Sequence, residues 1–319
     1  MIEITIIPES IQLLKMTDAE YFSSKYKDYI SNSKLGCINP DEGGSAEKFN
    51  SELKSSYSDS FELGSAIHAM LLQPDFYHIA DINKPTGKLG VWAEEVFKLR
   101  QQGLSIYDAT QQASINADYY AKNFSKTRFN TAVQGSLDFY LKRLNFIDQV
   151  DKQTLFLSAP IQEKFEQCML GIANNPKVME TLYPEGLLSN PEVFNEYAIL
   201  CELQLVNTET GEIKIVKFKA KLDNFTINHE TQTIVLNDLK SSGSPANYFM
   251  GNKVKKTNED GTEEFVWYNG SFQKYHYYRQ MGVYLWLLQH ATSQLYQLDY
   301  EFKANIIVIE TTPDYKSKV

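Results

Sequence analysis

The stretch from about Val193 to Lys240 constrains the fold most, because it contains three consecutive strand-like segments joined by two tight turns. The first two segments, NEYAILCELQLV and EIKIVKFKAKLDNFTI, are rich in β-branched and aromatic residues and flank the turn NTETG. A second turn, NHETQ, leads into the third segment, TIVLNDLK. The pattern predicts an antiparallel meander, and Asp223 is expected to close its second strand.

The segments around this meander predict helices and one further strand. FELGSAIHAMLL (61–72) indicates a helix that stops before Pro74, and FQKYHYYRQMGVYLWLLQH (272–290) indicates a second, strongly periodic helix. ANIIVIETTP predicts a last strand, and Asp260-Gly261 is typical of an exposed hairpin turn. The order helix, helical insertion, three strands, helix, strand predicts an α/β fold. We expect a mixed sheet flanked by helices, with an inserted helical lobe.

This order also gives an expected domain division. Residues 1–60 form a polar, turn-rich N-terminal segment to which no role can be assigned. Residues 61–319 would form the main domain. Within it, residues 82–190 are predicted to be a mostly helical insertion, and residues 193–312 the core that carries the chemistry.

Composition excludes several classes of protein. The N-terminus, MIEITIIPES, lacks the basic start and long apolar core of a signal peptide, and no apolar run approaches the ~18 residues that span a bilayer. The three cysteines lie far apart, which argues against a disulfide framework, a zinc knuckle or a four-cysteine iron–sulfur cluster. We therefore expect a cytoplasmic protein without membrane association.

The net charge of −9 argues at first against a nucleic-acid partner. Affinity for DNA, however, depends on the local placement of Lys and Arg and not on the overall sum. An enzyme that releases its product can be acidic overall and basic in one groove. The charge lowers the expectation of DNA binding without excluding it.

The candidate chemistry centres on Asp223, Asp238 and Lys240. Adjacent antiparallel strands can bring the two carboxylates within reach of one divalent cation. Asp238 and Lys240 are two residues apart on a strand, so both should project from the same face. Hard oxygen ligands suit Mg²⁺ or Mn²⁺. An isolated acid-x-lysine pattern is usually an ordinary surface ion pair, so the interpretation depends on its context.

Two helices supply that context. Gly64 and His68 are four residues apart and share a helix face, where His68 can ligate a metal or contact a phosphate. Gln280 and Tyr284 share a face of the second helix in the same way, directly after Arg279. Gln280 is expected to hold Lys240 or a DNA phosphate, and Tyr284 to line the groove.

These residues together resemble the PD-(D/E)XK nucleases of the RecB and RecE (exonuclease VIII) type. That family shows GxxxH, D, DxK and QxxxY in this order, and the chain carries GSAIH (64–68), Asp223, DLK (238–240) and QMGVY (280–284). LLQPD (71–75) and the ending IIVIETTPDY also resemble the exonuclease VIII branch. The resemblance covers about residues 61–312, and relatives of this kind would be expected to continue with another helix beyond Val319.

The resemblance implies roles for individual residues. The metal ligands would be His68, Asp223, Asp238 and the carbonyl of Leu239; the catalytic residues would be Asp223, Asp238, Lys240, Gln280 and Tyr284. It further implies a Mg²⁺- or Mn²⁺-dependent exonuclease acting on double-stranded DNA ends in phage or prophage recombination. A homo-oligomeric ring around DNA and a single-strand annealing protein as partner would be typical of such enzymes.

Weaker features leave alternatives open. Alternating lysines on the second strand, among them Lys219 and Lys221, can follow a phosphate backbone together with Arg279 and Gln280, or form a solvated sheet face. Glu196 is expected to be a solvated glutamate at the start of a strand, and the alternative is an extra acid near the metal. A structure-selective endonuclease on the same core and an inactive nuclease-fold module for DNA binding or assembly are the alternative functions.

Overall fold

The computed structural model describes residues 1–40, 43–51, 58–117, 138–139, 142–143, 152–185, 191–258, 260–296 and 299–319. The chain forms two compact units, and each is described by itself. Unit 1 comprises Met1–Ser60 and Gln167–Val319, and unit 2 comprises Phe61–Glu166. Within the expected helical insertion (82–190), most residues between 118 and 151 and residues 186–190 lie outside the described residues.

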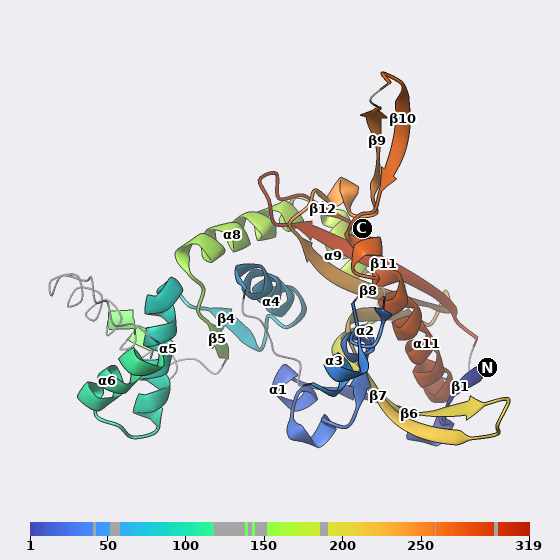
Figure 1. Ribbon diagram of the computed structural model, residues 1–319, viewed down its shortest axis with the longest axis horizontal. Helices are drawn as coiled ribbons and strands as arrows, with labels where there is room; N and C mark the ends of the chain where they lie inside the picture. The colour runs from blue at the N-terminus through green and yellow to red at the C-terminus, as the bar shows by residue number, and fades with distance from the viewer. Residues whose placement is uncertain are drawn as a thin grey trace. The chain divides into compact units, whose positions relative to one another are not determined.

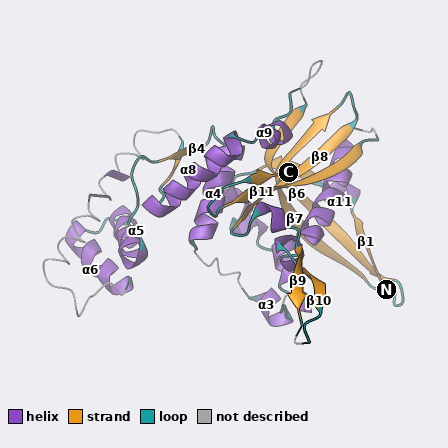
Figure 2. Cartoon of the chain, turned by 90° about the horizontal axis from the view of Figure 1, so that it is seen from above, coloured by secondary structure: helices purple, strands orange, loops and turns teal. Residues whose placement is uncertain are grey.

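Unit 1 is built on an eight-stranded mixed sheet (Figures 1 and 2). The strand order is β1-β6-β7-β8-β11-β12, with β2 also paired to β6 and β3 to β7. The pairs β11–β8 and β3–β7 are parallel and the remaining pairs are antiparallel. The strands are β1 (Ile2–Ile6), β2 (Gln12–Lys15), β3 (Ile30–Ser31), β6 (Glu192–Asn207), β7 (Ile213–Asn228), β8 (Thr233–Ser242), β11 (Glu301–Glu310) and β12 (Ser317–Lys318). The expected α/β class with a mixed sheet and flanking helices is confirmed.

The N-terminal segment, to which the sequence assigned no role, supplies three strands of this sheet. β1 and β2 extend the β6 edge, and β3 pairs with the middle of β7. The short helix α1 (Asp18–Tyr21) lies between β2 and β3, and two more short helices, α2 (Asn32–Gly36) and α3 (Ala46–Asn50), follow β3. The capping box between Thr17 and Glu20 fixes the start of α1.

The long helix α11 (Tyr277–Tyr296) lies against the sheet and closes the main core (Figure 2). The sequence predicted one helix from residue 272, but α10 (Ser271–Lys274) ends first. His276 separates the two helices because its φ of 52° is left-handed. The β9–β10 hairpin (Asn252–Thr257 and Glu263–Tyr268) projects from the unit between β8 and α10 (Figure 1).

Both long strands change the face that they turn to the core. Residues three apart on a regular strand lie on opposite faces, yet Leu222 and Phe225 of β7 belong to the same core cluster. On β6, Phe194 and Tyr197 both pack against that cluster as well. The expectation that Asp223 closes its strand is therefore wrong. β7 continues to Asn228, and the strand changes faces at Asp223 instead.

Unit 2 is mostly helical. It contains most of α4 (Asp59–Leu72), the parallel pair β4 (Tyr77–Ile79) and β5 (Gln153–Leu155), α5 (Gly87–Gln101) and α6 (Ile106–Asn116). Helix α8 (Ala159–Ala173) begins in unit 2, and α9 (Pro176–Leu182) belongs to unit 1. Trp92 is fully buried between α5 and α6, where its indole N–H donates to the Ser114 hydroxyl at 2.9 Å. Among the described residues, none of the helices combines the length and the apolar character needed to cross a membrane.

Candidate functional site

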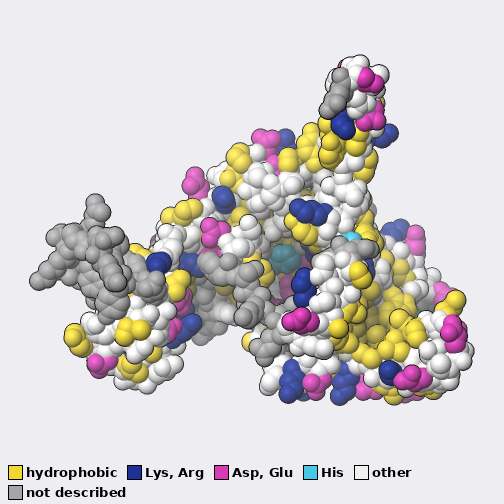
Figure 3. Space-filling model, in the orientation of Figure 1, with side chains coloured by type: hydrophobic (Ala, Val, Ile, Leu, Met, Phe, Trp, Pro, Cys, Tyr) yellow, Lys and Arg dark blue, Asp and Glu magenta, His cyan; other side chains and the backbone are white. Residues whose placement is uncertain are grey.

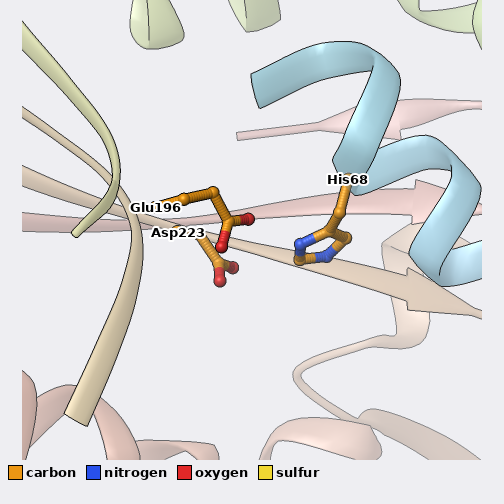
Figure 4. A group of neighbouring side chains, drawn as sticks. All are labelled: His68, Glu196 and Asp223. Carbon is orange, nitrogen blue, oxygen red and sulfur yellow. The ribbon is translucent and has the colours of Figure 1, made fainter. Parts of the chain in front are cut away.

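Three carboxylates lie at one level across the neighbouring strands β6, β7 and β8. The pairs Asn195–Asn224 and Tyr197–Leu222 leave Glu196 directly opposite Asp223. The pair Asn224–Asn237 makes Asp238 the next residue on the other side. Carboxylate oxygens of Glu196 and Asp223 lie within 4.8 Å of each other (Figure 4). The adjacent antiparallel strands thus bring the carboxylates of Glu196 and Asp223 together. That Asp223 and Asp238 bind one cation stays a prediction.

Glu196 is under both conformational and electrostatic strain. Its φ of 58° is left-handed, which is costly for a residue with a Cβ, and within a strand such strain often accompanies a functional site. Like charges directly opposite each other also destabilise a sheet. Burial, and then the nearby Asp223 carboxylate, raise the pKa of Glu196 to about 7 against the opposing effect of Lys221. The expectation of a solvated strand-end glutamate is wrong, because the Glu196 side chain is only 13% exposed and lies within β6.

Asp223 and Asp238 are held by different partners. One Asp223 oxygen accepts the backbone N–H of Leu239 at 2.7 Å, so the carboxylate acts as an acceptor for the neighbouring strand. Asp238 is fully buried; it accepts the Gln280 amide at 2.9 Å and pairs with the Lys240 ammonium at 2.5 Å. Gln280 was expected to hold Lys240 or a DNA phosphate, but its amide contacts Asp238 instead. The spacing of Asp238 and Lys240 does place them on one face.

Lys240 is oriented by groups on three sides. Besides Asp238, its ammonium donates to the Leu239 carbonyl at 3.2 Å and lies 5.1 Å from the centre of the Tyr277 ring. Burial alone would lower the pKa of Lys240, but Asp238 and Asp223 outweigh it and the pKa is raised. The lysine therefore stays charged at neutral pH.

Tyr284 lies one helical turn after Gln280 on α11. Burial, and then the negative charge of Asp238, raise its pKa well above 10, so the phenol stays neutral. Gln280 and Tyr284 thus form a neutral polar layer of α11 beside the carboxylates. The sequence placed Tyr284 in a groove, whereas the structure places it half-buried within the main core.

The remaining predicted DNA contacts are engaged within the protein. Lys219 is buried and donates to the Tyr21 carbonyl at 2.7 Å, and burial lowers its pKa. The expectation of a phosphate-contacting Lys219 is therefore wrong. Lys221 bridges Glu196 at 2.6 Å and Asp18 at 2.5 Å, so it neutralises the carboxylate row.

Arg279, the other predicted DNA contact, is half-buried. Its Nε donates to the side-chain oxygen of Asn32 at 3.2 Å. This contact joins the start of α11 to the N-terminal segment.

His68 lies half-buried on α4, in unit 2. Figure 4 draws it with Glu196 and Asp223, which belong to unit 1. A ligand role for His68 stays a prediction.

A row of asparagines, which sequence reasoning missed, lies one residue away from the carboxylates. The register pairs Asn195, Asn224, Asn237 and Asn305 across β6, β7, β8 and β11. Each amide donates to the next, at 2.9 Å from Asn305 to Asn237, 2.6 Å from Asn237 to Asn224, and 2.7 Å from Asn224 to Asn195.

Three members of this asparagine ladder also donate to other polar groups. Asn237 and Asn224 also donate to the carbonyls of Thr181 and Leu182, and Asn195 donates to the Tyr183 hydroxyl. Because Asn237 and Asp238 are consecutive on a regular strand, the ladder lies on the face opposite Asp238. Only the pairing register could have revealed it.

The donor set fits a hard divalent cation. Glu196 and Asp223 offer oxygens to a common point, and a bound cation would favour the ionised form of Glu196, whose pKa is raised to about 7 even beside Lys221. Asp238 already pairs with the Lys240 ammonium, and the Leu239 carbonyl accepts a hydrogen bond from the same ammonium. The residues present can therefore hold a metal, and Glu196 belongs to the set that the sequence predicted without it.

Comparisons with protein-family models, with curated proteins and with solved structures found no match for this chain.

Proposed function

We propose that the chain is a Mg²⁺- or Mn²⁺-dependent deoxyribonuclease of the PD-(D/E)XK type, acting as an exonuclease on double-stranded DNA ends. The observation that carries this proposal is the row of Glu196, Asp223 and Asp238 on three adjacent strands, with Lys240 fixed beside it. A purely structural sheet gains nothing from three carboxylates at one level. The order of the four motifs in the sequence supports the same proposal.

The divalent cation would be held by Glu196 and Asp223, with Asp238 and His68 as further ligands, and would polarise the phosphodiester. Lys240 Nζ donates a hydrogen bond to the attacking water and stabilises the negative charge that develops on the non-bridging oxygens. Gln280 holds Asp238 so that it keeps Lys240 in place. Attack in line with the leaving oxygen inverts the configuration at phosphorus and needs no covalent enzyme intermediate.

The proposal extends to the cellular setting that the resemblance implies. We propose a role in phage or prophage DNA recombination in the cytoplasm, with a single-strand annealing protein as partner and a homo-oligomer as the working form. These points rest on the resemblance alone.

The test compares end-labelled linear duplex with covalently closed circular DNA in Mg²⁺, Mn²⁺ and EDTA. Metal-dependent loss of the linear DNA only, abolished in Asp238→Asn and Lys240→Met, is expected. Asp314 and Lys316 provide a matched control, because they form an ion pair at the same spacing but are exposed. Asp314→Asn and Lys316→Met should retain activity.

Other outcomes identify the alternatives. Cleavage of closed circles would favour an endonuclease, because an exonuclease needs an end. Tight DNA binding without cleavage under either metal would refute the enzyme and favour an inactive binding module.

A further inference from the structure

Acidic residues are distributed unevenly around the β9–β10 hairpin. In residues 239–298 all four acids fall within the six-residue stretch 259–264 of the sequence, which includes Glu263 and Glu264 at the start of β10. The flanking stretches 239–258 and 265–298 contain none, in a chain with 40 acids and a net charge of −9. The same stretches carry Lys253, Lys274 and further basic residues. The stem of the hairpin and the start of α11 are therefore the part of unit 1 suited to a polyanion.

Large aromatic side chains are exposed on these same elements. Phe265 and Trp267 of β10, and Tyr275 and Tyr278 beside the start of α11, are each more than half exposed. Single exposed aromatics are ordinary, but several within one short segment indicate a binding surface. Figure 3 shows hydrophobic and basic side chains gathered over the stem of the hairpin, with acidic ones nearer its tip.

On one face of the hairpin, lysines of β9 are paired with aromatic residues of β10. Lys253 is opposite Trp267 and Lys255 is opposite Phe265, so that all four share one face of the two-stranded sheet. Lys255 forms an exposed ion pair with Glu263 near the tip at 2.5 Å. Lys253, nearer the stem, has no ion-pair partner among the described residues. Lys274 lies over the Tyr275 ring at 5.4 Å from its centre.

Two glycines hold the hairpin stem against the rest of the unit. A Cβ at Gly270 would lie 2.4 Å from the Tyr248 carbonyl, and one at Gly251 would lie 2.6 Å from the Tyr268 carbonyl. The backbones therefore pack too closely for any side chain. Trp267 closes over Gly251, where its ring would meet the same Cβ at 2.8 Å. The stem is thus a fixed platform.

A chain of ring contacts connects this platform to the candidate site. Tyr277, which lies under the Lys240 ammonium, is 5.8 Å from the Tyr275 ring and stacks on Phe249 at 5.7 Å. The Phe249 carbonyl accepts the N–H of Phe272 in α10. The exposed Tyr275 ring therefore contacts Tyr277, which is one of the residues around Lys240.

We propose that the aromatic–lysine surface, consisting of Lys253, Phe265, Trp267, Lys274, Tyr275 and Tyr278, binds single-stranded DNA. Its identity as DNA rests on the proposed function. Exposed rings stack on bases only where the bases are unpaired, and the interleaved lysines match the phosphates between them. A duplex would offer its phosphates but not its base faces. The surface would hold one strand next to the site that hydrolyses it.

The experiment measures binding of the full chain to a fluorescent oligo(dT) 20-mer by anisotropy in EDTA, which prevents metal-dependent cleavage. Trp267→Ala should weaken binding about tenfold or more, and Trp267→Phe should restore most of it. Lys253→Ala should lower the salt dependence of log Kd by about 0.7. Tyr107→Ala, which removes another exposed aromatic, is the control and should bind as the wild type. Circular dichroism verifies that each variant is folded.

Three results would overturn the proposal: no binding of oligo(dT) by the wild type, equal binding by Trp267→Ala, or an equal loss for a blunt duplex of the same length. The nuclease proposal is decided separately by cleavage of linear duplex in Mg²⁺. A chain that binds oligo(dT) through Trp267 but never cleaves DNA keeps this surface and loses the enzyme. If the chain cleaves linear duplex but does not bind oligo(dT) through Trp267, the nuclease proposal stands and the proposal for this surface fails.

Discussion

Replacing Glu196 by Gln should stabilise the metal-free protein at high pH. Because the folded-state pKa of Glu196 is raised, its stabilising contribution is present below pH 4.5 and is lost as pH rises through about 7. The difference between 4.5 and about 7 corresponds to about 3 kcal/mol at roughly 1.4 kcal/mol per pH unit. Gln cannot ionise and therefore avoids this loss. Lys221 keeps Asp18 as its partner in the variant.

The assay is urea denaturation in EDTA at several pH values from 5 to 8.5, followed by circular dichroism. The variant and the wild type should be similar near pH 5, and the variant should be more stable by about 3 kcal/mol at pH 8. Glu3→Gln, on the exposed edge strand β1, controls for the loss of a charge. The pH dependence of its unfolding free energy should match that of the wild type. Parallel curves for Glu196→Gln and the wild type across the whole range would refute the reasoning.

A bound metal should offset the stability advantage of Glu196→Gln over the wild type. A divalent cation neutralises the opposed carboxylates and stabilises the folded state by binding to it. At pH 8 saturating Mn²⁺ should therefore stabilise the wild type more than Glu196→Gln. Equal stabilisation of both would show that Glu196 is strained for a reason other than metal binding.

Three further predictions concern the surrounding residues. Asn237→Ala removes three hydrogen bonds of a fully buried side chain and should cost about 2–4 kcal/mol in urea unfolding, whereas replacing the half-buried Asn305 by Ala should cost about 1 kcal/mol; equal losses would contradict the ladder. Lys240→Met should lower the single-turnover cleavage rate at least 100-fold while DNA affinity in EDTA changes less than threefold, and a parallel loss of affinity would make it a binding residue. His68→Gln should weaken Mn²⁺ binding measured by calorimetry about tenfold or more, and an unchanged affinity would exclude it as a ligand.

The strands and helices around the site were predictable because their patterns are local. The β-branched and aromatic residues of β6, β7 and β8 and the turns between them placed three adjacent strands correctly. The periodicity of α11 placed Gln280 and Tyr284 on one face. The start of that helix was predicted too early, because nothing in the sequence signals the left-handed His276.

Pairing between distant segments was not predictable in the same way. The segment 1–60 has short, irregular strands whose partners lie about 200 residues away, so no local pattern reveals β1 and β2 on β6. In the sequence, Lys219 is one of several alternating lysines expected at the surface. Its burial comes from Tyr21, which lies in the distant N-terminal segment. Glu196 looked like a strand-end residue because its opposition to Asp223 depends on register alone.

Local spacing alone cannot separate a site from a surface pair. Asp314 and Lys316 repeat the spacing of Asp238 and Lys240, but their side chains are 67% and 64% exposed. Asp238 and Lys240 are 2% and 15% exposed, and α11 covers them. Burial therefore gives the ion pair of Asp238 and Lys240 its strength and orientation, since water screens the exposed pair.

The asparagine ladder accounts for how the sheet tolerates the carboxylate row. Opposed acids favour any slip that separates them, and a slip of one residue would turn every side chain of a strand to the other face. Such a slip would leave the buried amides of Asn224 and Asn237 without partners, at about 1–3 kcal/mol for each unsatisfied group. That cost is comparable to the roughly 3 kcal/mol penalty on ionised Glu196. The ladder therefore fixes the register from one face of the sheet, while the acids beside it remain strained and available to a cation.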